Sequence, residues 1–347
     1  RERMYPTKRA CNSCGSGAEK VGTLLTGVWR ISVLSVYALI FFPLLGCSSS
    51  DPDSVPKTIE VSISSDGKRI AVLNNAGEKQ SRVQIMYLDR SDKWFDLPTP
   101  PRTTSIRFGL LAHQLLLTHL DQEAYFSELS TIDLGVISAG PIPRKILFKG
   151  DVLAYPIEVE EGRILVRHCK FTLVVCPWNL IRDGKLEREV VSSDRVQYSL
   201  QYGQPVVVRG KGFYWLTYKQ ENTPEFGPDV LAFSFDEGGV FQPKVPAIDH
   251  RLDSVACDYS GARCLHAFTE ETSPVLFLYN TKVLFKREIC SIDGVAGWSD
   301  GASLSPDGRF GVKSLAAGFD KPRHVVYFEF DPAKCEPSVV KHIPLSR

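Results

Sequence analysis

Short runs of β-branched and aromatic residues, separated by polar turn residues, follow one another along most of the chain. No stretch beyond residue 57 repeats its apolar positions with the 3.6-residue period of a helix. The runs instead fall into groups of four. The first group covers Ile59–Ile63, Arg69–Leu73, Arg82–Asp89 and Trp94–Leu97. This pattern predicts an all-β fold built from short antiparallel strands.

A polar turn between the first two runs of a group recurs along the chain at intervals of about 50 residues. It reads Ser64-Ser65-Asp66-Gly67 near the start and Ser305-Pro306-Asp307-Gly308 near the end. Related turns lie at Glu161-Gly162, Lys211-Gly212 and Ser260-Gly261, with a degenerate copy at Ala112-His113. The third strand of each unit is predicted at Arg82–Asp89, Phe126–Leu134, Thr172–Leu180, Asp229–Asp236, Pro274–Asn280 and His324–Asp331. The fourth is predicted at Trp94–Leu97, Arg144–Phe148, Leu186–Val191, Val240–Val245, Val283–Ile289 and Ser338–Ile343.

Four short strands in a unit of this length are typical of a β-propeller blade. The sequence therefore predicts a six-bladed propeller of four-stranded antiparallel blades over residues 58–347, with seven blades as the alternative. The Ser-Pro-Asp-Gly turn resembles the WD40-like repeats of TolB-type six-bladed propellers. That resemblance implies an architecture and not an activity. We also expect the ring to close without the exchange of a strand between its first and last blades.

The N-terminal region carries a different signal. Fifteen uncharged residues, Ile31–Leu45, follow Arg30 and precede a small residue and a cysteine, which is the layout of a secretory signal peptide. Leu44-Leu45-Gly46-Cys47 resembles the lipobox of bacterial lipoproteins. The resemblance implies that Cys47 is lipidated and becomes the first mature residue, and Ser48 after it implies sorting to the outer membrane. We expect residues 1–46 to be the upstream region and signal peptide and 47–57 a flexible tether. The alternative is a plain signal peptide or an N-terminal anchor.

Six cysteines follow the tether, and an even number in an exported chain suggests disulfides. Cys257 and Cys264 lie symmetrically about the Ser260-Gly261 turn, where opposed residues of a hairpin come within reach of a disulfide. Cys169 and Cys176 are likewise symmetric about a short turn. The remaining pair would be Cys290 with Cys335. Buried free thiols are the alternative.

Composition excludes some partners and indicates no chemistry. The chain has 41 Lys and Arg against 40 Asp and Glu, so no overall field attracts nucleic acid. The seven histidines form no metal-ligand spacing, and His168 and His266 are expected to be ordinary strand residues. No hydrolase nucleophile motif or phosphate-binding loop is present, and no cofactor is expected. The carboxylates considered for a channel site are Asp66, Asp253, Asp258 and Asp307, although turn chemistry already explains the Asp-Gly pairs.

The longer connections indicate where a partner would bind. Antiparallel strands place all second-to-third and fourth-to-first connections at one end of a propeller, opposite the Asp-Gly turns. Phe226, Trp298 and Phe319 lie in long connections of this kind and are the binding-face candidates. The alternative is that these aromatic side chains pack on their own blades. The sequence favours a lipid-anchored, non-catalytic platform for another envelope protein. The alternative is a propeller enzyme, a hydrolase or lactonase with a site in the channel.

Overall fold

A computed structural model provides the structure of the chain. It describes residues 59–90, 93–121, 126–136, 143–169, 177–191, 206–218, 228–236, 239, 254–260, 263–267, 275–279, 287–291, 301–315, 324–331, 334 and 336–345. The chain divides into two compact units, Arg1–Ser54 and Val55–Arg347. All described residues belong to the second unit. None of the described helical structure is long and apolar enough to cross a bilayer.

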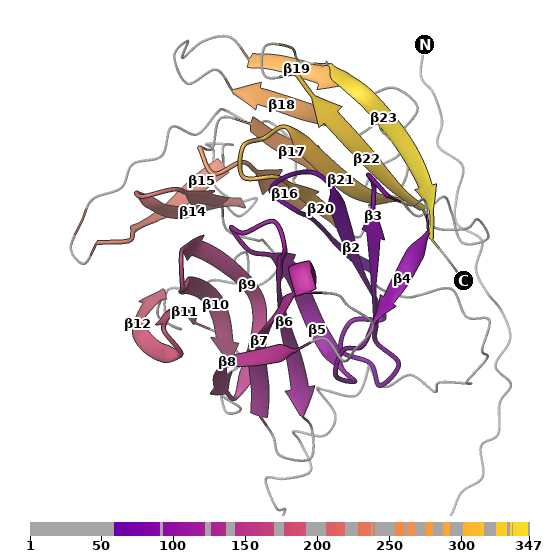
Figure 1. Cartoon of the computed structure of the whole chain (residues 1–347). Helices are drawn as coiled ribbons and strands as arrows, with labels where there is room; N and C mark the ends of the chain where they lie inside the picture. The colour runs from indigo at the N-terminus through magenta and orange to yellow at the C-terminus, as the bar shows by residue number, and fades with distance from the viewer. Residues whose placement is uncertain are drawn as a thin grey trace, which may run out of the picture. The chain divides into compact units, whose positions relative to one another are not determined.

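The described strands form six antiparallel sheets, five of four strands and one of three, each built from strands consecutive in the chain (Figure 1). We number them blades 1 to 6. Blades 1 to 3 contain β1 (Ile59–Ile63), β2 (Arg69–Asn74), β3 (Arg82–Tyr87), β4 (Trp94–Leu97), β5 (Thr103–Phe108), β6 (Gln114–Asp121), β7 (Phe126–Asp133), β8 (Arg144–Gly150), β9 (Val152–Glu160), β10 (Arg163–Cys169), β11 (Trp178–Arg182) and β12 (Lys185–Val191). Blades 4 to 6 contain β13 (Val206–Val208), β14 (Gly212–Tyr218), β15 (Pro228–Ser234), β16 (Ser254–Cys257), β17 (Arg263–Ala267), β18 (Val275–Tyr279), β19 (Arg287–Ser291), β20 (Ala302–Leu304), β21 (Phe310–Leu315), β22 (His324–Phe330) and β23 (Pro337–Pro344). A 3-10 turn, η2 (Leu134–Val136), follows β7.

Neighbouring blades meet through their first strands. β1 lies against β5, β5 against β9, β13 against β16, β16 against β20, and β20 against β1. Blades 3 and 4 share one apolar cluster. Blades joined in this way by their innermost strands define a β-propeller. The predicted all-β propeller with four-stranded antiparallel blades is therefore confirmed.

The predicted strands agree closely with the observed ones in blade 1, where β1 and β4 have the predicted bounds. The largest difference is the third strand of blade 3, predicted from Thr172 but observed to begin at Trp178. Pro177 precedes it and has no N–H to contribute to a ladder, although its carbonyl accepts a hydrogen bond from His168 N at 2.9 Å. Residues 171–176, like the predicted fourth strand of blade 4 (Val240–Val245), lie outside the described residues.

Strand alternation explains how the blades pack. In β1, Ile59, Val61 and Ile63 are buried against blade 6 in one apolar cluster. The intervening Glu60 and Ser62 accept hydrogen bonds from the backbone of β5 in blade 2. The next strand is apolar on both faces, because both of its faces are covered by neighbouring blades. The hydrophobic core of the propeller is therefore a series of clusters between blades.

The repeated turn has the same hydrogen bonds in blades 1 and 6. Ser64 Oγ donates to Asp66 Oδ1 at 2.6 Å, and Ser305 Oγ donates to Asp307 Oδ1 at 2.6 Å. Each serine hydroxyl also accepts the N–H that begins the second strand, at 2.9 Å in both turns. The glycines that close the turns, Gly67 and Gly308, both have φ of +70°, which glycine adopts without strain. The expected turn role of these Asp-Gly pairs is confirmed.

Blades 6 and 1 meet without sharing a strand, since each sheet is built from its own four consecutive strands. Within the described strands, the expected closure without strand exchange is therefore confirmed. The junction contains the apolar cluster around β1, a hydrogen bond from Ile63 N to Ser303 Oγ at 3.3 Å, and one from Trp94 Nε1 to Pro344 O at 2.8 Å. The Phe310 ring of blade 6 covers Gly67 of blade 1.

The cysteines are described in part. The register of β16 and β17 places Cys257 directly opposite Cys264, the arrangement from which their disulfide is predicted. Cys169 ends β10 and Cys290 lies in β19, opposite Leu276. Their predicted partners Cys176 and Cys335, and the lipidation candidate Cys47, lie outside the described residues. All three disulfides stay predictions.

The glycine under Phe310 provides a test of the junction between blades 6 and 1. A Cβ at Gly67 would lie 2.3 Å from Phe310 Cγ, whereas a Cβ at Gly210, which has a similar φ of +68°, would meet nothing within 4 Å. Both alanine variants incur the left-handed strain of about 1–2 kcal/mol. We expect Gly67→Ala to lower the free energy of unfolding by a further amount of roughly 1–3 kcal/mol, because its Cβ would displace the Phe310 ring. Urea unfolding measures both; equal losses in the two variants would contradict this packing.

Candidate channel site

The three predicted channel carboxylates that the structure describes belong to turns. Asp66 accepts from Ser64 Oγ and Lys68 N, and Asp307 accepts from Ser305 Oγ and Arg309 N. Asp258 occupies the place of these serines in blade 5, where its Oδ1 accepts the N–H of Arg263 at 3.1 Å. Asp253, the fourth, lies outside the described residues. The described carboxylates of this set therefore stabilise hairpins and do not converge on the channel.

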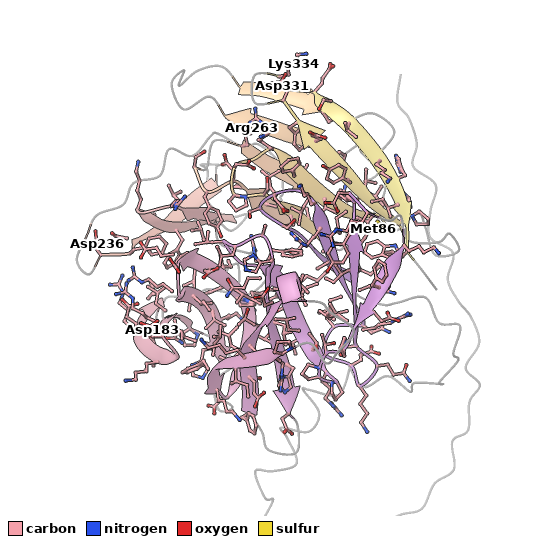
Figure 2. All side chains as sticks on the ribbon, in the orientation of Figure 1. Met86, Asp183, Asp236, Arg263, Asp331 and Lys334 are labelled. Carbon is pink, nitrogen blue, oxygen red and sulfur yellow. The ribbon has the colours of Figure 1, made fainter. Side chains whose placement is uncertain are left out.

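Arginines at the start of second strands connect alternate blades to their neighbours at the turn end. Arg69 of blade 1 donates from Nη1 to Ala112 O of blade 2 at 3.3 Å. Arg263 of blade 5 donates to Gly308 O at 3.2 Å and to Asp331 O at 3.1 Å, both in blade 6 (Figure 2). Because the acceptors are backbone carbonyls, these bonds fix the relative positions of whole blades.

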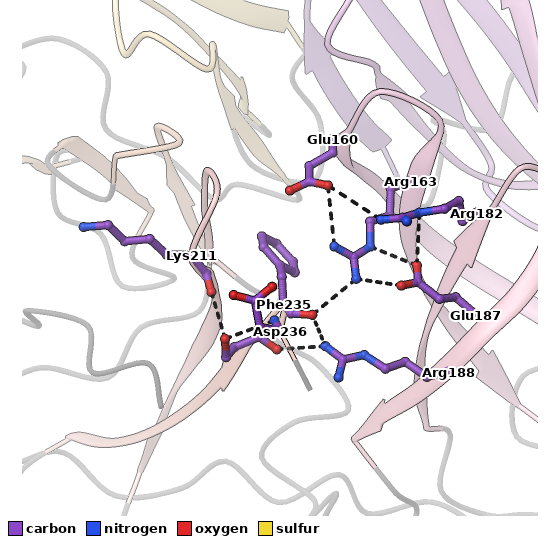
Figure 3. A network of polar contacts seen from close by, with 9 residues as sticks. Glu160, Arg163, Arg182, Glu187, Arg188, Lys211, Phe235 and Asp236 are labelled. Carbon is purple, nitrogen blue, oxygen red and sulfur yellow. Dashed lines mark hydrogen bonds and ion pairs between the residues drawn. The ribbon is translucent and has the colours of Figure 1, made fainter. Parts of the chain in front are cut away.

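The equivalent arginine of blade 3 is the centre of a larger network (Figure 3). Arg163 is held by Glu187 through two hydrogen bonds, at 2.9 and 2.8 Å, and donates to Phe235 O of blade 4 at 3.2 Å. Arg188 donates to the same carbonyl and to Ser234 O. The guanidinium of Arg163 also lies 5.5 Å from the centre of the Phe235 ring. Blade 4 is thus connected to blade 3 by charge-assisted bonds to its backbone.

A second group of ionisable side chains comes from the innermost strands and the turn end. Electrostatic interactions link Glu60 of β1 to Arg107 of β5, and Arg107 to Tyr259, which follows β16. Tyr155 of β9 interacts with Glu60 and with Arg167 of β10, whose guanidinium lies 5.5 Å from the Tyr155 ring centre. We call Glu60, Arg107, Tyr155, Arg167 and Tyr259 the channel cluster. It brings together side chains from blades 1, 2, 3 and 5.

Glu60 is the most perturbed acid of the channel cluster. Burial raises its pKa from 4.5 to about 8, against the opposing effects of the Ile106 N–H and of Arg107. Its Oε2 accepts the N–H of Ile106 at 3.2 Å. Glu60 and Arg107 are nevertheless partly exposed to solvent. Burial disfavours the charged form of an acid, so Glu60 holds its proton to higher pH than an exposed glutamate does.

Tyr155 owes its position to an irregularity in blade 3. The pairing of β9 with β10 shifts between Leu165 and Arg167, which inserts one extra residue into β9 beside Tyr155. Tyr155 has φ of +54°, in the left-handed region that a bulky residue rarely adopts, and it precedes a proline. Its N–H donates to Ser105 Oγ of blade 2 at 3.0 Å, which secures this conformation. Bulges of this kind commonly redirect a side chain next to a functional site.

Tyr259 spans the turn end of the channel. Its hydroxyl donates to Glu158 O at 2.7 Å, a bond from blade 5 to blade 3 that passes blade 4. Its own backbone N–H donates to Pro306 O of blade 6, and its carbonyl accepts the N–H of Arg209 of blade 4. Burial raises the pKa of Tyr259 to about 12, so the hydroxyl keeps its proton in the physiological range. One residue thus connects four blades.

The Glu158 side chain completes this end of the channel. It is 4% exposed, and its two carboxylate oxygens accept the N–H groups of Leu110 at 2.7 Å and Gly162 at 3.2 Å. Its charge is therefore engaged by the backbone of blades 2 and 3. No group of His, Cys, Asp and Glu residues in the described part of the chain is arranged to hold a metal ion.

The residues of the channel cluster differ from the site residues predicted from the sequence. Phe226, Trp298 and Phe319 lie outside the described residues, so their predicted role stays untested. His168 is the strand residue that was expected, and its Nε2 accepts the N–H of Asp151 at 3.2 Å. The missed signals were Glu60, which alternates with three buried apolar residues in β1, and a Tyr-Pro pair within the run that forms β9.

Comparison with known proteins places the fold. No protein-family model matches the chain, and no curated protein is detectably related in sequence. TolB from Acinetobacter baumannii superimposes with a TM-score of 0.51 at 13% identity, over 82% of this chain and 65% of that one. The β-propeller domain of the trilobed protease from Pyrococcus furiosus gives 0.46 at 14% identity, over 85% and 86% of the two chains. The likeness to TolB shows a shared propeller fold.

Ionisation of Glu60 predicts how stability depends on pH. Its pKa is about 8 in the folded protein and near 4.5 in the unfolded chain, so the folded state binds more protons between these values. Stability therefore falls as pH rises through this window and levels off above it. Glu60→Gln keeps an acceptor for Ile106 N but has no proton to lose. We expect its free energy of unfolding to rise, relative to that of the wild type, by roughly 1 kcal/mol or more between pH 5 and pH 9. Urea unfolding across this range measures the difference, and parallel curves would contradict the shift.

Proposed function

We propose that this chain is a lipid-anchored protein of the bacterial envelope whose propeller is a non-catalytic platform for another envelope protein. The observation that carries this proposal is the unequal use of the two ends of the propeller. At the turn end, the described Ser, Asp and Arg side chains are bonded to turns and to neighbouring blades. The long connections leave the blades at the other end.

The hydrogen bonds of the turn end support a structural role for that end. Asp66, Asp258 and Asp307 bind backbone or hydroxyl groups of their own hairpins. Arg163 and Arg263 bind carbonyl groups of the next blade. Replacing these contacts with contacts to a partner would weaken the junctions between blades, so this end is poorly suited to reversible binding.

The opposite end has the length and the composition for binding. The chain between β12 and β13 covers residues 192–205, between β14 and β15 residues 219–227, between β19 and β20 residues 292–301, and between β21 and β22 residues 316–323. Phe226, Trp298 and Phe319 belong to these connections. Aromatic residues on loops supported by a rigid scaffold are common anchors of protein interfaces.

We infer six blades and not seven for this platform. Six sheets are built from the described residues, and the innermost strand of the first lies against those of both the second and the last. A seventh blade would have to lie between sheets that are already in contact or share an apolar cluster. Anchoring through Cys47 and location at the outer membrane, facing the periplasm, are inferred from the lipobox-like Leu44-Leu45-Gly46-Cys47 alone.

The lipid anchor has a direct test. Acylation of Cys47 would hold the protein at the membrane, at about 0.8 kcal/mol per buried CH₂. We expect Cys47→Ala to abolish acylation and to prevent normal recovery in the membrane fraction. The control Cys290→Ser is expected to change neither acylation nor recovery. Mass spectrometry of the mature N-terminus checks the modification. An unmodified residue there, or cleavage at another position, would contradict it.

The binding face is tested by capture from membranes in bacteria that express the anchored protein. We expect Trp298→Ala, Phe226→Ala and Phe319→Ala each to weaken capture of the partner about thirtyfold, which corresponds to about 2 kcal/mol. Phe95→Ala is the matched control, since Phe95 is 50% exposed on β4 at the outer edge of blade 1. A lower melting temperature with unchanged capture would assign these aromatic residues to the fold and would contradict the proposed face.

The acid of the described residues that the enzyme alternative would use is Glu60, because burial raises its pKa to about 8. An acid that titrates near neutral pH is suited to proton transfer in hydrolysis. Turnover of ester or lactone substrates by the purified chain, lost in Glu60→Gln and retained in Phe95→Ala, would support a hydrolase or lactonase over the platform.

A further inference from the structure

A buried lysine of blade 6 has no partner for its charge. The side chain of Lys313 in β21 is 0% exposed, and its Nζ has no hydrogen-bond partner in the described part of the chain. Lysine is almost never fully buried unless it is paired, because its ammonium group loses its hydration there. Burial lowers the pKa of Lys313 from 10.5 to about 8. The charged form of Lys313 therefore opposes the packing around it.

The register of β21 places this side chain between blades 5 and 6. The residues directly opposite Lys313 on β20 and β22 are Ala302 and Val326. Both pack in the apolar cluster that contains Ala256 of blade 5. Opposed residues of a sheet share a face, so Lys313 faces blade 5. The preceding residue, Val312, packs in the cluster on the other face, toward blade 1.

No carboxylate of the described residues neutralises the amine of Lys313. On the same face of blade 6, His324 of β22 and His342 of β23 have their ring centres 5.3 Å apart. The charged side chains that blade 5 contributes to this face, Asp258 and Arg263, lie at the turn end beside Gly308. The other described side chains that pack here are apolar.

The junction of blades 5 and 6 also lacks a hydrogen bond that other junctions have. Ser62 and Ser303 each lie two residues before the serine of their turn, and each accepts a backbone N–H of the next blade. In blade 5 the place of the turn serine is taken by Asp258, so the equivalent residue is Ala256. An alanine methyl group cannot accept this bond.

At the turn end, in contrast, blades 5 and 6 are held by three hydrogen bonds. Tyr259 N donates to a carbonyl of blade 6 at 3.0 Å, and Arg263 donates to two more at 3.1 and 3.2 Å. Lys313 lies near the opposite end, two residues before β21 ends. The junction is thus bonded at one end and contains an unpaired amine toward the other.

We propose that the propeller opens at the junction of blades 5 and 6, hinged at the turn end, and that protonation of Lys313 favours the open state. Opening lets water solvate the ammonium group. Loss of the proton leaves a neutral amine that tolerates its apolar surroundings, so the junction closes. This device is a property of the propeller and does not depend on the function proposed above.

The proposal predicts that opening decreases as pH rises. The pKa of Lys313 is about 8 in the closed junction and near 10.5 once the amine is in water, so the open state binds more protons between these values. The opening equilibrium of the wild type is expected to fall about tenfold from pH 7 to pH 9. Amide hydrogen exchange of β16 and β20, corrected for the intrinsic exchange rate at each pH, measures it.

Lys313→Met tests the role of the amine, because methionine fills a similar space without a charge. We expect exchange of β16 and β20 at pH 7 to slow at least about tenfold in this variant and to lose its dependence on pH. Lys79→Met is the matched control, since Lys79 is exposed in the turn between β2 and β3, and it should behave as the wild type. Exchange of β1 and β5, at the junction of blades 1 and 2, should be the same in both variants.

Two results would overturn the proposal. One is unchanged exchange of β16 and β20 in Lys313→Met, and the other is equal slowing in all blades, which would assign Lys313 to global stability. If Lys313→Met fails to fold, as judged by circular dichroism, the wild type decides. Opening of β20 that does not decrease from pH 7 to pH 9 would then overturn the proposal.

Discussion

The junction between blades 6 and 1 is the constraint on which the rest of the propeller depends. The two blades share no strand, so the ring closes through side-chain contacts and not through a backbone ladder. The closing contacts are the apolar faces of β1 and β21, the ring of Phe310 over Gly67, and the bond from Ile63 N to Ser303 Oγ. The hydrogen bond contributes only about 1 kcal/mol, so most of the stabilisation at this junction comes from the buried apolar cluster. Closure therefore requires close complementarity of the two faces.

The same bond recurs one step along the ring, which shows how a repeat sequence specifies a ring. Ser62 occupies in blade 1 the position that Ser303 occupies in blade 6, two residues before the serine of each turn. Ser303 accepts the N–H of Ile63, and Ser62 accepts the N–H of Phe108 at 2.9 Å. A single hydroxyl on the innermost strand thus positions the next innermost strand. In blade 2 the equivalent position holds Arg107, and there the pattern changes from scaffold to channel.

Much of this fold could be predicted from the sequence because its determinants are local. The turn at Ser305-Pro306-Asp307-Gly308 sets its own geometry through bonds between residues a few positions apart. The flanking strands follow from β-branched runs of the right length, as β1 and β4 illustrate. In the third blade the described strand begins at Trp178, directly after Pro177, and the earlier part of the predicted strand lies outside the described residues.

The channel cluster could not be predicted in this way, because its contacts join residues far apart in the chain. Tyr259 and Glu158 are separated by 101 positions, and no local pattern relates them. Nor does the sequence show that Glu60 and Arg107 are near each other, since this depends on the rotation between two blades. The sequence does contain two residues that depart from the pattern of their strands. Glu60 is a carboxylate among the apolar residues of β1, and Tyr155 precedes a proline within β9.

These exceptions show how scaffold and candidate site are divided within one fold. A strand that only supports a ring needs apolar residues and small hydroxyls toward its neighbours, as Ser62, Ser105 and Ser303 provide. Glu60 is a poor choice for that purpose, because burial disfavours its charged form and the bond to Ile106 N could be made by a neutral side chain. Tyr155 is a poor choice for a left-handed position that glycine would occupy without strain. Both departures lie on innermost strands and interact with each other, so they are better explained together, by the channel, than separately by the stability of two blades.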